Sequence, residues 1–146
     1  MKMEQYEINK DLNKQENRPE LLTVLCVLTF IGSGIGVVSN FFVLTSYSSI
    51  QELISVGNLT FPGIDILLSV DKTYFLIGFI LSSISLFGAY NMWKLKKIGF
   101  HFYTIAQILL LIVPYFYFQN FGFPYFGLLI TVTFVFLYNL NLKAMS

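Results

Sequence analysis

The longest uncharged stretch of the sequence decides its fold class: IGFHFYTIAQILLLIVPYFYFQNFGFPYFGLLITVTFVFLYNLNL, residues Ile98–Leu142. These 45 residues include no Asp, Glu, Lys or Arg. A helix crosses the hydrocarbon core of a bilayer with about 20 residues, so the stretch is too long for one span. Its middle, Gln119–Pro124, has the Gly and Pro typical of a turn. We therefore predict two spans, at about 99–118 and 125–142.

Two further uncharged runs precede this stretch. The run Leu21–Gln51 has 31 residues and becomes polar at Thr45–Ser49, so it supplies one span at about 21–44. The run Thr73–Trp93 has 21 residues and supplies another span at about 73–93. Together the runs predict an all-α integral membrane protein, a bundle of four transmembrane helices.

The composition excludes other classes. Charged residues make up 12% of the chain, about half the share in a soluble domain, and the mean hydropathy is +0.69. A soluble globular domain, a disordered chain and a nucleic-acid-binding protein are all disfavoured by these values. We expect membrane lipid, and no nucleic acid, among the partners of the chain.

The basic residues predict the orientation of the spans, because Lys and Arg near helix ends favour the cytoplasmic side. With both termini inside, eight of the nine basic residues are cytoplasmic and one is outside. The eight are Lys2, Lys10, Lys14, Arg18, Lys94, Lys96, Lys97 and Lys143, and the outer one is Lys72. We therefore predict a multi-pass protein of the cell inner membrane with cytoplasmic N- and C-termini.

Two segments lie outside the predicted spans. Residues 1–18 form a polar cytoplasmic tail before the membrane domain, 19–146, and we favour a tail without fixed structure over a short surface helix. The outer loop, 45–72, is expected to contain a short interfacial helix. Its start is indicated by a capping box at Ser49–Glu52 and its end by Gly57.

Small residues recur at helical spacing in the first two predicted spans. Such faces let helix backbones approach closely, which stabilises helix pairs in lipid. The predicted helix-packing residues are Gly32, Gly36 and Asn40 in the first span and Gly78, Ser82, Ser85 and Ala89 in the second. We expect these faces to pack within the chain, and we keep an interface with another molecule as the alternative.

Uncharged polar side chains are the remaining candidates for a site. Gln107 and Thr104 share one helical face and are expected to point into the bundle, either as interhelical hydrogen bonds or as the lining of a pore. Near the cytoplasmic boundary, four side chains are candidates for contact with anionic lipid headgroups. They are Lys94, Lys96, Lys97 and His101.

The stretch Met92–Tyr103, MWKLKKIGFHFY, is the most distinctive motif in the chain. It resembles a pattern in small, uncharacterised four-helix membrane proteins of bacteria. There, a Trp-basic turn and a Gly-aromatic pair join the two middle helices. The resemblance implies a bacterial inner-membrane protein and carries no activity with it.

The sequence shows little of the chemistry that catalysis needs. Ionisable residues within spans mark proton and ion pathways, and the predicted spans contain no Asp, Glu, Lys or Arg. Cys26 is the only cysteine and His101 the only histidine, so neither a disulfide nor a metal site is indicated, and we expect no cofactor.

We therefore favour a non-catalytic accessory, scaffold or assembly subunit, either a homo-oligomer or a partner of other membrane protein subunits. The alternative is a small oligomeric channel or permease for an uncharged or small solute. A lipid-modifying enzyme that uses His101 is the least favoured reading.

Overall fold

A computed structural model describes residues 1–16, 18–57, 69–118 and 124–145 of the 146-residue chain. These residues are all-helical. The elements are α1 (Lys2–Glu16), α2 (Glu20–Ser55), α4 (Lys72–Trp93), α5 (Ile98–Tyr117), α6 (Tyr125–Leu140) and a 3-10 helix, η1 (Leu142–Ala144). By length and composition, α2, α4 and α5 could each cross a membrane, and α6 is a shorter apolar helix of 16 residues.

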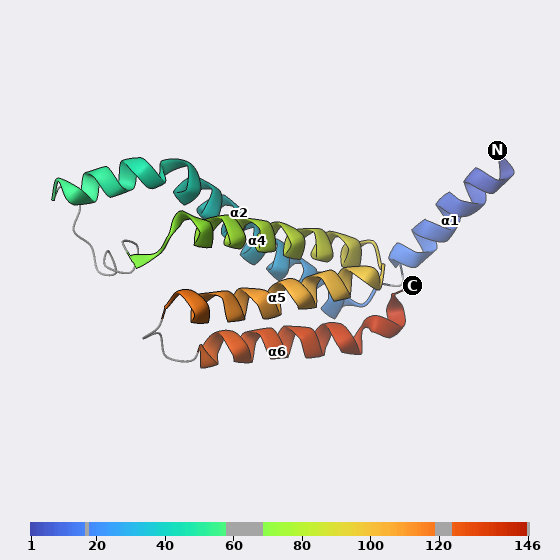
Figure 1. Ribbon diagram of the computed structural model, residues 1–146. Coiled ribbons are helices and arrows are strands. Elements are labelled where there is room, and N and C mark those ends of the chain that lie inside the picture. The colour runs from blue at the N-terminus through green and yellow to red at the C-terminus, as the bar shows by residue number, and fades with distance from the viewer. Residues whose placement is uncertain (17, 58–68, 119–123, 146) are drawn as a thin grey trace.

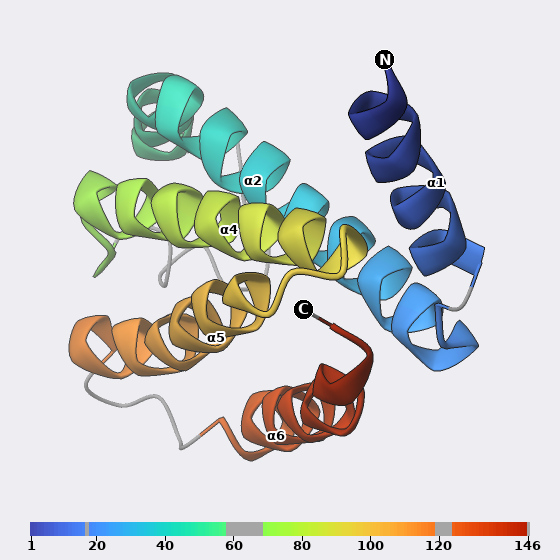
Figure 2. The same ribbon diagram turned by 90° about the vertical axis from the view of Figure 1, so that its right-hand side faces the viewer.

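The four apolar helices lie side by side, and α1 projects from one end of them (Figure 1). Seen from that end, α4 lies between α2 and α5, and α6 lies next to α5 (Figure 2). The turn between α4 and α5, the junction between α1 and α2, and the C-terminus all lie at this same end. We call it the basic end, because Lys94, Lys96 and Lys97 lie in that turn.

Three helices begin and end close to the predicted spans. The span predicted at 73–93 corresponds to α4, and that at 99–118 corresponds to α5. The span predicted at 125–142 corresponds to α6, which ends two residues earlier. Pro124 directly precedes α6, as expected of a helix start, while residues 119–123 of the predicted turn lie outside the described residues.

The first helix differs from its prediction. The chain stays helical from Glu20 to Ser55, so the separate helix expected after Ser49 is instead the C-terminal end of α2. The polar residues Thr45–Ser49 do not interrupt the helix. The Thr45 hydroxyl, for example, donates a hydrogen bond to the carbonyl oxygen of Phe41 in the same helix, 3.0 Å away. In Figure 1, α2 bends and its C-terminal part runs away from α5 and α6.

The end of α2 is as predicted. Gly57 has a φ of +75°, a left-handed conformation that glycine adopts without steric cost, and its N–H donates to the carbonyl of Ile54. Residues 58–68 of the predicted outer loop lie outside the described residues.

The N-terminal tail is helical, so the favoured prediction of a tail without fixed structure is wrong. Residues Lys2–Glu16 form α1, and its described side chains are exposed. Ile8 and Leu12 are spaced as on one face of a helix, but both side chains are more than half exposed. Figures 1 and 2 show α1 extending away from the bundle, so it contributes little to the core.

Two glycines bring α4 and α5 into backbone contact. A Cβ on Gly88 would lie 2.7 Å from the backbone nitrogen of Tyr103, and one on Gly99 would lie 2.7 Å from that of Met92. The intervening turn places Leu95 at a φ of +59°, which is uncommon for a residue other than glycine. Its side chain is 2% exposed, so burial offsets the cost of that conformation.

The hydrophobic core lies at the basic end of the bundle. It combines side chains from the start of α2, the ends of α4 and α6, and the start of α5. Its buried members are Leu22, Leu25, Cys26, Ala89, Met92, Leu95, Tyr103, Tyr138 and Met145. The bundle is therefore held most tightly at the end that carries the basic turn.

Candidate functional site

The interface between α2 and α4 is built from the predicted small residues. A Cβ on Gly36 would lie 2.8 Å from the Ser82 hydroxyl oxygen, and one on Gly78 would lie 2.6 Å from the Asn40 side-chain oxygen. Each glycine thus makes room for a polar side chain of the opposite helix. Asn40 in turn donates a hydrogen bond to the carbonyl of Gly36 at 2.7 Å.

A hydrogen-bonded set of side chains links three helices at the centre of the bundle. The hydroxyls of Ser33 on α2 and Ser85 on α4 lie 2.8 Å apart, and the amide nitrogen of Gln107 on α5 donates to Ser85 at 3.1 Å. Ser85 is fully buried. The structure therefore places Gln107 in an interhelical hydrogen bond, which is one of its two predicted roles. Ser33 was missed by the sequence analysis.

Gly32 does not pack within the chain, which was the favoured of its two predicted roles. This residue is exposed, and a Cβ placed on it would meet nothing within 4 Å. One residue along the chain, Ser33 takes its place against α4. Ala89, the last residue of the predicted stripe on α4, is fully buried in the core at the basic end.

The attachment of α6 to the bundle depends on Tyr138, a residue that the sequence did not single out. Its hydroxyl lies 2.8 Å from that of Thr29 on α2. Its ring packs edge-on against Tyr103 of α5, with 5.1 Å between centroids. Both tyrosines are 3% exposed or less. The pattern of apolar residues carries no signal for this cluster, because tyrosine is also expected at membrane interfaces.

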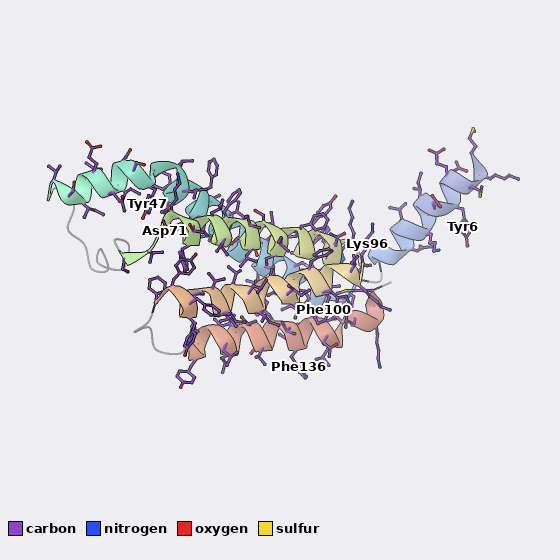
Figure 3. The ribbon with its side chains drawn as sticks, viewed as in Figure 1. Tyr6, Tyr47, Asp71, Lys96, Phe100 and Phe136 are labelled. Atoms are coloured by element: carbon purple, nitrogen blue, oxygen red, sulfur yellow. The ribbon has the colours of Figure 1, made fainter. Side chains whose placement is uncertain are left out.

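Beyond this attachment, α5 and α6 leave a groove between them of about 810 Å³. Nine of its thirteen lining residues are apolar. It is lined by Phe100, Thr104, Ile108, Leu111, Ile112 and Tyr115 of α5 and by Pro124, Leu128, Thr131, Val132, Val135, Phe136 and Asn139 of the α6 segment. Figure 3 shows Phe100 and Phe136 on these two helices, toward the basic end where Lys96 also lies. Sequence analysis did not predict this groove.

Thr104 and Gln107 were predicted to share one helical face, but they contact different neighbours. Although both are on α5, Gln107 contacts α4 whereas Thr104 lines the groove beside α6. The Thr104 hydroxyl is buried and has no hydrogen-bond partner among the described residues. Thr133 on α6 behaves differently, since its hydroxyl donates to the carbonyl of Leu129 in its own helix. The Thr104 hydroxyl is thus an unused donor buried in the α5 wall of the groove.

The predicted headgroup-binding residues all lie at the basic end and are exposed. They are Lys94, Lys96, Lys97 and His101. The Lys94 ammonium group lies 4.5 Å from the centroid of the Tyr90 ring, a cation–π contact. His101 packs its ring against Phe100, which lines the groove. Basic side chains therefore lie at the same end of the bundle as Asn139, one of the polar residues that line the groove.

No group of three or more His, Cys, Asp and Glu side chains that could hold a metal ion occurs within the described part of the chain. Its helices are consistent with a membrane protein, since three of them are long and apolar enough to span a bilayer. Comparisons with protein families, with curated proteins and with solved structures found no match.

Proposed function

We propose that the chain is a non-catalytic, four-span protein of the bacterial inner membrane that acts as an accessory or assembly subunit through helix packing. The fourth span is α6. Its 16 residues extend for about 24 Å, close to the ~30 Å of the hydrocarbon core, and η1 continues it. Figure 1 shows α6 running alongside α5, which supports a bilayer depth similar to that of its neighbour.

Cytoplasmic termini are supported by the positions of the basic residues. The α1–α2 junction, the α4–α5 turn and the C-terminus lie at one end of the bundle, whereas Asp71 lies at the other (Figures 1 and 3). Lys72 directly follows Asp71. The 36 residues of α2 correspond to a length of about 54 Å, more than the ~30 Å of the hydrocarbon core of a bilayer. Its C-terminal turns would therefore extend past the outer boundary of the hydrocarbon and lie at the membrane interface.

Two polar residues that could have lined a channel, Gln107 and Asn40, are used for packing. Gln107 and Ser85 are hydrogen-bonded to each other, and Asn40 fills the space beside Gly78. These contacts occupy donors and acceptors that a water-filled path would require. They therefore favour the packing role over the channel or permease.

The observation that carries the proposed function is a pair of exposed small residues on α2, Gly32 and Ser39, that α4 does not cover. They lie seven residues apart, so they share one side of the helix. Larger exposed side chains of α2, such as Leu28 and Ile35, lie beside them. Small residues let another helix approach closely at their positions, which bulky side chains prevent.

Site-specific photo-crosslinking in cells tests this function. A photoreactive amino acid replaces Leu28, which is one turn from Gly32 and 49% exposed, and a matched control replaces Ile105, which is 57% exposed on α5. We expect covalent adducts with another polypeptide at Leu28 and adducts with lipid alone at Ile105. Adducts with lipid alone at both positions would contradict the proposed function.

A further inference from the structure

The groove between α5 and α6 has the features of a ligand site that packing alone does not require. It is about 810 Å³ in volume, mostly apolar, and open along the outside of the bundle. At one end α6 is fixed by Tyr138, and farther along it approaches α5 again, where a Cβ on Gly127 would lie 3.2 Å from Leu111. The two helices therefore stay close to each other along the groove, which extends from Phe100 and Asn139 to Tyr115 and Pro124.

The length and lining of the groove suit a lipid chain. From Phe100 to Tyr115, its α5 wall is about 22 Å long, most of the depth of a hydrocarbon core. A hydrocarbon chain lying along α5 and α6 would bury its apolar surface against this mostly apolar lining.

The polar atoms of the groove indicate that this occupant carries an oxygen. Buried hydroxyls in apolar surroundings are destabilising unless they find a partner, and the Thr104 hydroxyl has none among the described residues. Thr131, 9% exposed, lines the groove from α6. A rotation of the Thr104 side chain about χ1 would turn its hydroxyl into the groove, where a carbonyl oxygen near one end of the hydrocarbon chain would accept its hydrogen bond.

The positions of two lysines indicate at which end of the groove a charged headgroup would lie. Lys97 precedes the groove residue Phe100 by three positions, and Lys143 follows the groove residue Asn139 by four. Both lysines are exposed at the basic end, whereas the groove ends in Tyr115 and Pro124 at the other. The groove therefore has a cationic, polar end and an apolar end.

We propose that this groove binds one molecule of an anionic phospholipid. Its acyl chain lies between α5 and α6, an ester carbonyl accepts the Thr104 hydrogen bond, and its phosphate lies beside Lys97 and Lys143. Thr104 is seven residues from Lys97, about 10 Å along the helix, so one lipid can reach both. This site lies between α5 and α6, whereas the proposed packing residues lie on α2. The lipid proposal is therefore independent of the proposed function.

Native mass spectrometry of the delipidated protein tests the proposal. The probes are phosphatidylglycerol and phosphatidylcholine of equal chain length, each added to the protein in a non-ionic detergent. We expect one retained phosphatidylglycerol per chain and weaker retention of phosphatidylcholine. The preference should fall roughly fivefold in each of Lys97→Gln and Lys143→Gln, and remain unchanged in Lys2→Gln on α1.

Variants of the groove complete the test. Ile112→Trp fills the groove and should abolish the single retained lipid, whereas Ile105→Trp on the exposed side of α5 should not. Thr104→Val, which keeps the side-chain shape, should weaken retention of both lipids by roughly fivefold, and Thr133→Val should have no effect. Equal retention of the two lipids by the wild-type chain, or equal retention by wild type and Thr104→Val, would overturn the proposal.

Discussion

Arg18 and Trp93 form a contact that ties the start of the membrane domain to the end of α4. The guanidinium carbon of Arg18 lies 4.4 Å from the centroid of the Trp93 ring, and the guanidinium donates a hydrogen bond to the Trp93 carbonyl oxygen. A cation at a helix C-terminus also interacts favourably with the partial negative charge of the last carbonyls. Arg18 therefore contributes to packing at the basic end.

Replacing Arg18 should destabilise the basic end of the bundle. Arg18→Ala removes the cation–π contact and the hydrogen bond, and we expect a loss of about 1–2 kcal/mol in the free energy of unfolding. Trp93 is the only tryptophan, so its fluorescence in detergent micelles reports both the local change and the unfolding transition. Lys10→Ala on the exposed helix α1 is the control, and an equal midpoint for the two variants would refute the role of Arg18.

The contact between α4 and α5 should not tolerate a methyl group. Gly88→Ala and Gly99→Ala would place a Cβ against backbone atoms that cannot move aside, and we expect each to cost about 2 kcal/mol or more. Gly34→Ala is the matched control, because nothing lies within 4 Å of its Cβ position. That variant should be neutral or stabilising by up to about 1 kcal/mol in thermal unfolding. Destabilisation of all three variants to the same extent would contradict close α4–α5 packing.

The hydrogen bonds around Ser85 should be energetically coupled. Ser85→Ala leaves Ser33 and Gln107 without their partner, and we expect it to cost about 1–2 kcal/mol. The double variant Ser33→Ala, Ser85→Ala should cost less than the sum of the single variants, because residues in one network are not additive. Chemical denaturation of all three variants measures the coupling. Strict additivity would show that the two hydroxyls do not interact.

The proposed orientation predicts which residues a membrane-impermeant thiol reagent reaches in intact cells. In a Cys26→Ala background, Asp71→Cys should be labelled from outside and Lys96→Cys only after the membrane is permeabilised. Both positions are exposed, and Figure 3 shows them at opposite ends of the bundle. Labelling of Lys96→Cys from outside, with Asp71→Cys protected, would reverse the orientation.

Much of the fold was predictable because charge is excluded from the apolar helices. The bounds of α4 and α5 lie within one residue of the predicted spans, since Lys72 and the lysines after Trp93 delimit α4. The polar run Thr45–Ser49 predicts an end to the first span, whereas α2 continues to Ser55. A helix tolerates such residues, and no Gly or Pro occurs between Val37 and Val56.

The site was less predictable, because it depends on which helix each face meets. Spacing placed Gln107 and Thr104 on the same side of one helix, yet the two residues contact different neighbours. Arg18 and Trp93 are 75 positions apart and share no local pattern. The groove results from how closely α6 approaches α5, which is a property of tertiary packing and has no counterpart in periodicity.

The most direct test of the packing function is native mass spectrometry of the protein extracted with its surrounding lipid into polymer nanodiscs. We expect an assembly larger than the 16.7 kDa chain, formed by copies of the chain or with another subunit. Gly32→Leu should disrupt it. Gly34→Leu should not, because its Cβ position is equally open but about 200° around the helix from Gly32. A strictly monomeric wild-type chain, accompanied by lipid alone, would contradict the account.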